Sequence, residues 1–93
     1  MSTLIKKMDK RIDELSELAS WFTLEKKETF DRLIIFQGLI KTREDRLSSG
    51  RVSSIKQFLK IDSNLKEKIS YKVTKDKNII VKYLIWEDKY EWN

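Results

Sequence analysis

Basic side chains concentrate in one part of this chain of 93 residues. Residues 51–82 hold nine Lys or Arg against three Asp or Glu, a net charge of +6, whereas residues 1–47 sum to +1 and residues 83–93 to −2. Ammonium and guanidinium groups bind phosphates and carboxylates, so such a segment is typical of a surface that binds a polyanion. The alternative is a solvated lysine-rich face without a ligand, and charge alone does not separate the two.

Several residue types that are common in catalytic and metal-binding sites are missing or rare in this chain. Cysteine and histidine do not occur, which excludes thiol nucleophiles, imidazole bases, disulfides and zinc sites of the Cys/His kind. The only glycines are Gly38 and Gly50, too few for a glycine-rich phosphate loop. General acid–base catalysis usually recruits His or a perturbed carboxylate. We therefore expect no enzymatic activity, no cofactor and no metal.

Length and hydropathy predict one domain, residues 1–93, in the cytoplasm. A chain of this size supports one modest core. Its longest apolar run, Leu33–Phe36, is far shorter than the roughly 18 residues of a membrane span. Acidic residues interrupt the N-terminal segment where an export signal would be apolar.

Two helices are predicted in the first half of the chain. Residues 1–22 place apolar side chains three or four positions apart, which is the stripe of an amphipathic helix. These side chains are Ile5, Met8, Ile12, Leu15, Ala19 and Phe22. The stripe either docks on the rest of the domain or pairs with a second copy in a homodimer, and both alternatives stay open. Residues 24–47 are predicted to form a central buried helix, because apolar residues from Phe30 to Ile40 would cover most of its circumference.

The stretch Ser54–Ile69, SIKQFLKIDSNLKEKI, contains three turn-forming residues in succession. The short side chains of Asp62, Ser63 and Asn64 favour caps and turns. They are predicted to separate two short helices, so that residues 51–70 form a helix-turn-helix. Residues 71–86 consist of two β-branched and aromatic flanks around a polar, basic centre, which predicts a β-hairpin.

This order of elements resembles winged helix-turn-helix DNA-binding domains over Val52–Tyr83. The helix-turn-helix motif would be IKQFLKIDSNLKEKI, and the wing would be YKVTKDKNIIVKY. The expected fold class is therefore α+β, mostly helical, winged helix-turn-helix-like with a C-terminal β-hairpin. The chain is short, rich in Lys and Ile, and free of cysteine. In these properties it is also similar to small proteins of crenarchaeal viruses and plasmids, several of which are dimeric winged-helix repressors or partition-site binders.

The resemblance implies a non-enzymatic, sequence-specific binder of double-stranded DNA. It would act as a transcriptional regulator or as a plasmid partition or replication-site binder of a mobile element. The helix from Ser63 would enter the major groove, where Asn, Lys and Glu side chains can pair with base edges. The residues at base edges would be Ser63, Asn64, Lys66 and Glu67. Phosphate contacts would come from Arg51, Lys56, Lys60 and Lys68, and wing contacts from Lys75, Lys77 and Asn78.

A protein-binding adaptor or inhibitor, such as a phage factor acting on a host enzyme, is the alternative. The helical stripe and the aromatic tail at residues 87–93 would then form the interface, and the lysines would serve solubility. Tyr and Trp are enriched at protein interfaces. We expect Trp86 to lie in the core and Trp92 in an interface with a second protein or a second copy.

Overall fold

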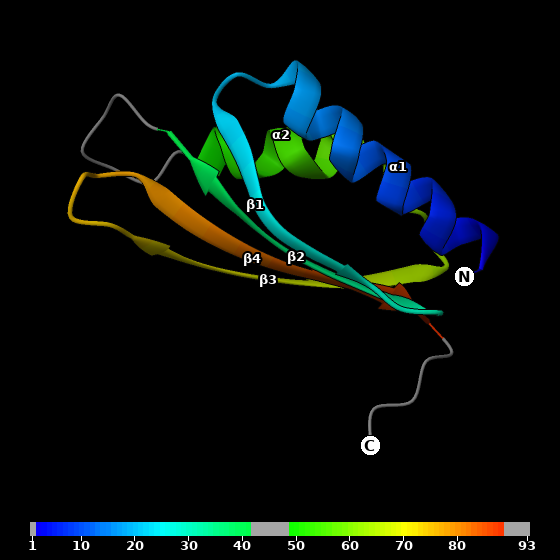
Figure 1. Cartoon of the computed structure of the whole chain (residues 1–93). Coiled ribbons are helices and arrows are strands. Elements are labelled where there is room, and N and C mark those ends of the chain that lie inside the picture. Colours follow the sequence, from blue (N-terminus) through cyan, green and yellow to red (C-terminus); the bar gives the residue numbers. More distant parts are fainter. Residues whose placement is uncertain (1, 42–48, 89–93) are drawn as a thin grey trace.

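The computed structural model describes residues 2–41 and 49–88 as two helices packed on one antiparallel sheet (Figure 1). The elements follow the chain as α1 (Thr3–Leu18), β1 (Phe22–Thr29), β2 (Leu33–Ile40), α2 (Ser49–Leu59), β3 (Leu65–Val73) and β4 (Ile79–Glu87). Strands hold more residues than helices, so the prediction of a mostly helical, winged helix-turn-helix-like fold is wrong.

The predicted N-terminal helix is present, but it ends at Leu18, and Phe22 of the predicted stripe begins β1. Of the two alternatives for the stripe, the structure shows docking on its own domain. The Ser2 hydroxyl caps α1 by accepting a hydrogen bond from the Ile5 backbone N–H at 3.2 Å. Ile5, Met8, Ile12 and Leu15 are all buried in the core. Their apolar surface is therefore unavailable as the predicted interface with a second copy or a second protein.

Residues 24–41, the described part of the predicted central helix, form no helix. The chain makes a β-hairpin instead, with Phe22 opposite Ile40 and Thr29 opposite Ile34 across β1 and β2. An unbroken apolar run fits a buried helix or a strand covered on both faces equally well. The β-branched residues in Leu33–Ile40 favour the strand. The end of the predicted helix, residues 42–47, lies outside the described residues.

The predicted helix-turn-helix is a helix, a turn and a strand. Helix α2 begins at Ser49, before the predicted start at residue 51, and ends before Lys60, whose φ of 51° is left-handed. Asp62 then forms a turn, because its Oδ1 accepts a hydrogen bond from the Asn64 backbone N–H at 2.8 Å. Strand β3 starts at Leu65, so the predicted recognition helix does not exist.

The C-terminal hairpin is present and longer than predicted. Strand β3 pairs with β4 from Leu65 opposite Glu87 to Val73 opposite Ile79. The Lys77 backbone N–H donates to the Thr74 carbonyl at 3.0 Å and closes the connecting turn. The aromatic tail, with Tyr90 and Trp92, lies outside the described residues, whereas Trp86 is half-buried in β4.

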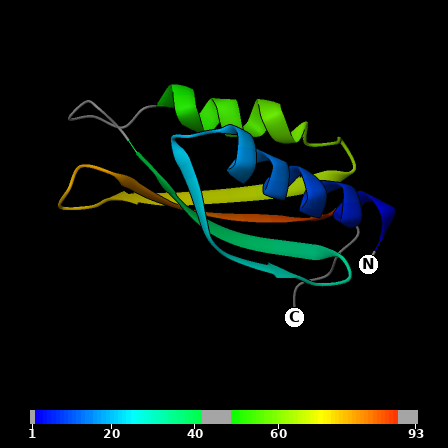
Figure 2. The same cartoon turned by 45° about the horizontal axis from the view of Figure 1, so that its top comes forward.

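The strand order β1-β2-β4-β3 places the two most apolar strands at the centre of the sheet. Both helices lie on the same side of it (Figures 1 and 2). The core fills the space between these layers, where α1 and α2 meet the buried side chains Ile34, Phe36, Val81, Tyr83 and Ile85. We call this the inner face of the sheet. No helix in residues 2–41 and 49–88 is long and apolar enough to cross a membrane.

A buried tyrosine connects the sheet to α2. The Tyr83 hydroxyl donates a hydrogen bond to the Glu67 carboxylate, and Lys56 Nζ lies 3.4 Å from Oε1 of the same carboxylate. Burial and the neighbouring Glu67 charge raise the pKa of Tyr83 well above its usual value. The folded protein therefore keeps Tyr83 protonated at pH values where the unfolded chain releases that proton.

We expect this difference to destabilise the protein in alkali. Below pH 10.0, the ordinary tyrosine pKa, the contribution of Tyr83 to the free energy of unfolding is fully present, and it falls as pH rises further. Tyr83→Phe should cost about 1–2 kcal/mol at neutral pH, because Glu67 loses a donor, and should flatten the alkaline decline. Urea unfolding between pH 8 and about 11 measures both effects. An alkaline decline that is equally steep in the variant would contradict this assignment.

Candidate nucleic-acid interface

The face of the sheet opposite the helices is covered by no element in the described part of the chain (Figures 1 and 2). We call it the outer face. Directly opposed residues of antiparallel strands share a face, so the pairing groups its side chains into rows. From one end to the other the rows are Thr23, Leu39, Ile80 and Lys72; Lys26, Gln37, Lys82 and Ser70; Glu28, Ile35, Leu84 and Lys68; and Leu33, Trp86 and Lys66.

Apolar side chains occupy the middle of the outer face. This apolar band consists of Leu33, Ile35 and Leu39 from β2 and Ile80, Leu84 and Trp86 from β4. All except the buried Leu33 are partly exposed. A contiguous apolar patch on a small protein is typical of a surface that binds another molecule.

Three lysines of the edge strand β3 line one side of the apolar band. This lysine border consists of Lys66, Lys68 and Lys72, all of which are exposed. Side chains two positions apart on a strand are separated by about 6.6 Å, so the ammonium groups form a row along the edge. Asp88 lies 3.6 Å from Lys66, and no carboxylate among the described residues pairs with Lys68 or Lys72.

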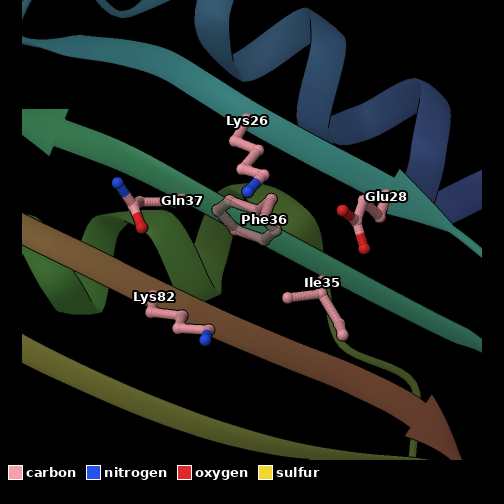
Figure 3. Close-up of a pocket in the computed structure, with 6 residues that line it drawn as sticks. All are labelled: Lys26, Glu28, Ile35, Phe36, Gln37 and Lys82. Carbon is pink, nitrogen blue, oxygen red and sulfur yellow. The ribbon is translucent and has the colours of Figure 1, made fainter.

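One polar row, Lys26, Gln37, Lys82 and Ser70, crosses all four strands through the apolar band. Two shallow hollows flank Gln37 and Lys82, with volumes of about 150 Å³ and about 240 Å³. Figure 3 shows Lys26, Gln37 and Lys82 projecting from three neighbouring strands beside the first hollow. The Gln37 amide nitrogen donates to Glu25 Oε1 at 3.4 Å, which holds its carbonyl oxygen toward the centre of the sheet.

Charge differs between the two sides of the outer face. On the β1 side, Lys26 lies between the exposed carboxylates Glu25 and Glu28. The charged residues that face outward from β3 itself are all lysines, with Asp88 beside Lys66 at one end, and Lys82 adds a fourth cation beside them. The positive field of the outer face is therefore strongest along β3 and β4.

Few of the predicted DNA-contact residues lie on this face. Lys66 and Lys68 do, whereas Glu67 points to the inner face as the acceptor of Tyr83. Arg51 lies on α2 with its guanidinium 5.4 Å from the Trp21 ring centre. The remaining predicted contacts fall on α2, on the turns at either end of β3, or just beyond them: Lys56, Lys60, Ser63, Asn64, Lys75, Lys77 and Asn78.

Three lysines of the outer face were missed by the sequence interpretation. Lys72 and Lys82 belong to the basic segment but were assigned no contact. The alternation of residues 66, 68, 70 and 72 was the signal of a strand with a polar face. Lys26 lies outside that segment, and only the sheet order brings it into a row with Lys82.

Within the described ranges no three acidic side chains gather as metal ligands would. The outer face offers cations, an apolar surface that includes Trp86, and one amide. No protein-family model matches this chain, and no curated protein or solved structure is significantly similar to it.

Proposed function

We propose that this protein binds DNA through the outer face of its sheet, without catalysing a reaction on it. It would do so in the cytoplasm, as a transcriptional regulator or as a partition or replication-site binder of a mobile element. The observation that supports this proposal is the gathering of five exposed lysines from three strands around an uncovered apolar surface.

The distribution of charge between the layers supports the same surface. Helix α1 carries four basic and four acidic side chains, and on α2 Lys56 pairs with Glu67 while Arg51 lies against the Trp21 ring. The outer face carries five lysines against the three carboxylates of Glu25, Glu28 and Asp88. A phosphate backbone is attracted to this surplus of exposed lysines, and sheets are known to bind DNA by their strands. The recognition helix that favoured duplex DNA in the sequence is replaced by β3, so the proposal no longer rests on that helix.

Salt dependence tests the proposal directly. In fluorescence anisotropy at about 50 mM salt, the protein should bind labelled DNA of arbitrary sequence. Each phosphate contact contributes about 0.7–0.9 to the slope of log affinity against log salt, so four or five lysine contacts predict a slope between about −3 and −4.5. No binding at low salt, or an affinity that salt does not change, would refute DNA binding.

The apolar band favours a second candidate, a protein-binding adaptor or inhibitor. Aliphatic surface of this kind is buried in protein interfaces, with the lysines as a polar rim. Sedimentation with and without DNA, together with a pull-down from host lysate, separates the two functions. A single stoichiometric protein partner without retained nucleic acid selects the adaptor. The same sedimentation run shows whether the protein is a monomer or the homodimer considered from its sequence.

A further inference from the structure

We infer that the outer face binds its nucleic acid as an unpaired strand, with phosphates along the lysine border and bases against the apolar band. This inference deepens the proposed function and rests on it. It names the form of DNA that the surface accepts. Three features of the outer face support it: the one-sided charge, the width of the sheet and the aliphatic character of its centre.

The positive charge of the outer face lies along one side of the sheet, where it can bind one row of phosphates. Lys66, Lys68 and Lys72 follow one edge of the sheet, and Lys82 stands beside them on β4. On the opposite edge the carboxylates of Glu25 and Glu28 offset Lys26. A duplex presents two phosphate backbones to any surface that covers a groove, and the second would meet net negative charge here. A single strand needs only the β3 side.

The width of the sheet leads to the same result. Neighbouring strands lie about 4.8 Å apart, so three spacings place β1 about 14 Å from β3. The grooves of B-form DNA are about 12 Å and 6 Å wide. With one backbone on the lysine border, the second would lie between β2 and β1 for the wider groove, where Ile35, Leu39 and Glu28 face outward. For the narrower groove it would lie close to β4, where Ile80 and Leu84 face outward. Aliphatic side chains leave phosphates without hydrogen bonds.

The apolar band suits unpaired bases. The bases of a single strand expose flat, weakly hydrated faces, and proteins cover such faces with apolar and aromatic side chains. Ile80 and Leu84 lie directly beside the lysine border, within one strand spacing of it. Between them, the Gln37 amide and the Lys82 ammonium group offer hydrogen bonds to base edges. In a duplex the base faces are stacked on one another and the pairing edges are hydrogen-bonded to the other strand, so neither could contact this surface.

The test compares three labelled probes in anisotropy at one salt concentration. They are an oligothymidine of about 12 nucleotides, the same strand annealed to its complement, and an abasic strand of the same length. We expect the oligothymidine to bind at least about 10-fold more tightly than either of the others, because only it offers bases. Its salt slope should be about −3, from four contacts to a single strand.

A double variant tests the apolar band. Ile80→Thr with Leu84→Thr keeps strand-forming residues while removing apolar surface, so oligothymidine affinity should fall by about 10-fold or more. The abasic strand should bind as before. Val73→Thr is the matched control, because Val73 is an exposed aliphatic residue of β3 on the inner side. Thermal melts of all three proteins verify folding.

The outcomes distinguish this inference from the proposed function. Duplex affinity equal to or above that of the oligothymidine overturns the unpaired strand and leaves DNA binding intact. Equal binding of the abasic strand overturns the contact between bases and the apolar band. Binding of none of the probes refutes the proposed function itself.

Discussion

Gly38→Ala is expected to lower the free energy of unfolding by about 2–3 kcal/mol, although it adds a single methyl group. A Cβ at Gly38 would lie 2.3 Å from Cε2 and 2.4 Å from Cζ of Phe22, and 3.1 Å from the Thr23 carbonyl oxygen. The Phe22 ring is buried, and it packs edge-on against Phe36 with ring centres 6.3 Å apart. The ring therefore has no free space to move into, and the strands would have to separate.

Thermal and urea unfolding measure this cost. The melting temperature should fall by about 10–20 °C for a chain of this size. Phe22→Leu in the Gly38→Ala background provides the control, because removing the ring also removes the clash. The double variant should lose less stability than the sum of the two single variants. Additive losses, or a Gly38→Ala protein as stable as the parent, would show that the ring adapts.

The strand around Gly38 also shows how much of the fold could be predicted from the sequence. Gly38 permits close packing in an apolar run, since its missing Cβ leaves room for the Phe22 ring. Apart from Gln37, the run Leu33–Ile40 has no polar side chain on either face, because one face is buried in the core and the other, partly exposed, forms the apolar band. Apolar residues on both faces removed the alternation by which a strand is normally recognised. Helix α1, with one buried stripe, kept its period and was predicted correctly.

The secondary structure of the segment after Asp62 depends on pairing with a strand that comes later in the chain. The turn-forming residues at its start interrupt the chain as predicted. Leu65–Val73 then forms a strand because β4 offers nine residues of pairing to it, and tertiary pairing overrides local propensity. The candidate site depends on the same pairing, since it assembles residues from four strands. Lys66 and Lys68 were expected to contact DNA because of the winged helix-turn-helix resemblance, whereas the row that joins Lys26 to Lys82 arises from the strand order.

Reversing the charge of two border lysines should have the largest effect on binding. Lys68→Glu with Lys72→Glu removes two phosphate contacts and places carboxylates in their positions. At about 0.1 M salt each lost contact removes about 0.7–0.9 log units of affinity, so neutralisation alone predicts a loss of about 25- to 60-fold. Repulsion by the new carboxylates should extend this to about 100-fold or more. Stability should change little, because both side chains are exposed.

Helix α1 supplies the matched control for this variant. Lys7→Glu with Lys10→Glu changes the net charge of the protein by the same amount, on exposed positions of the opposite layer. If the outer face binds DNA, this control should lose less than about 3-fold in affinity, because distant charges are screened at this salt concentration. Equal losses in both variants would mean that DNA responds to net charge alone. The lysine border would then be only a solvated edge of the sheet, and the assignment of the outer face as the DNA-binding surface would be wrong.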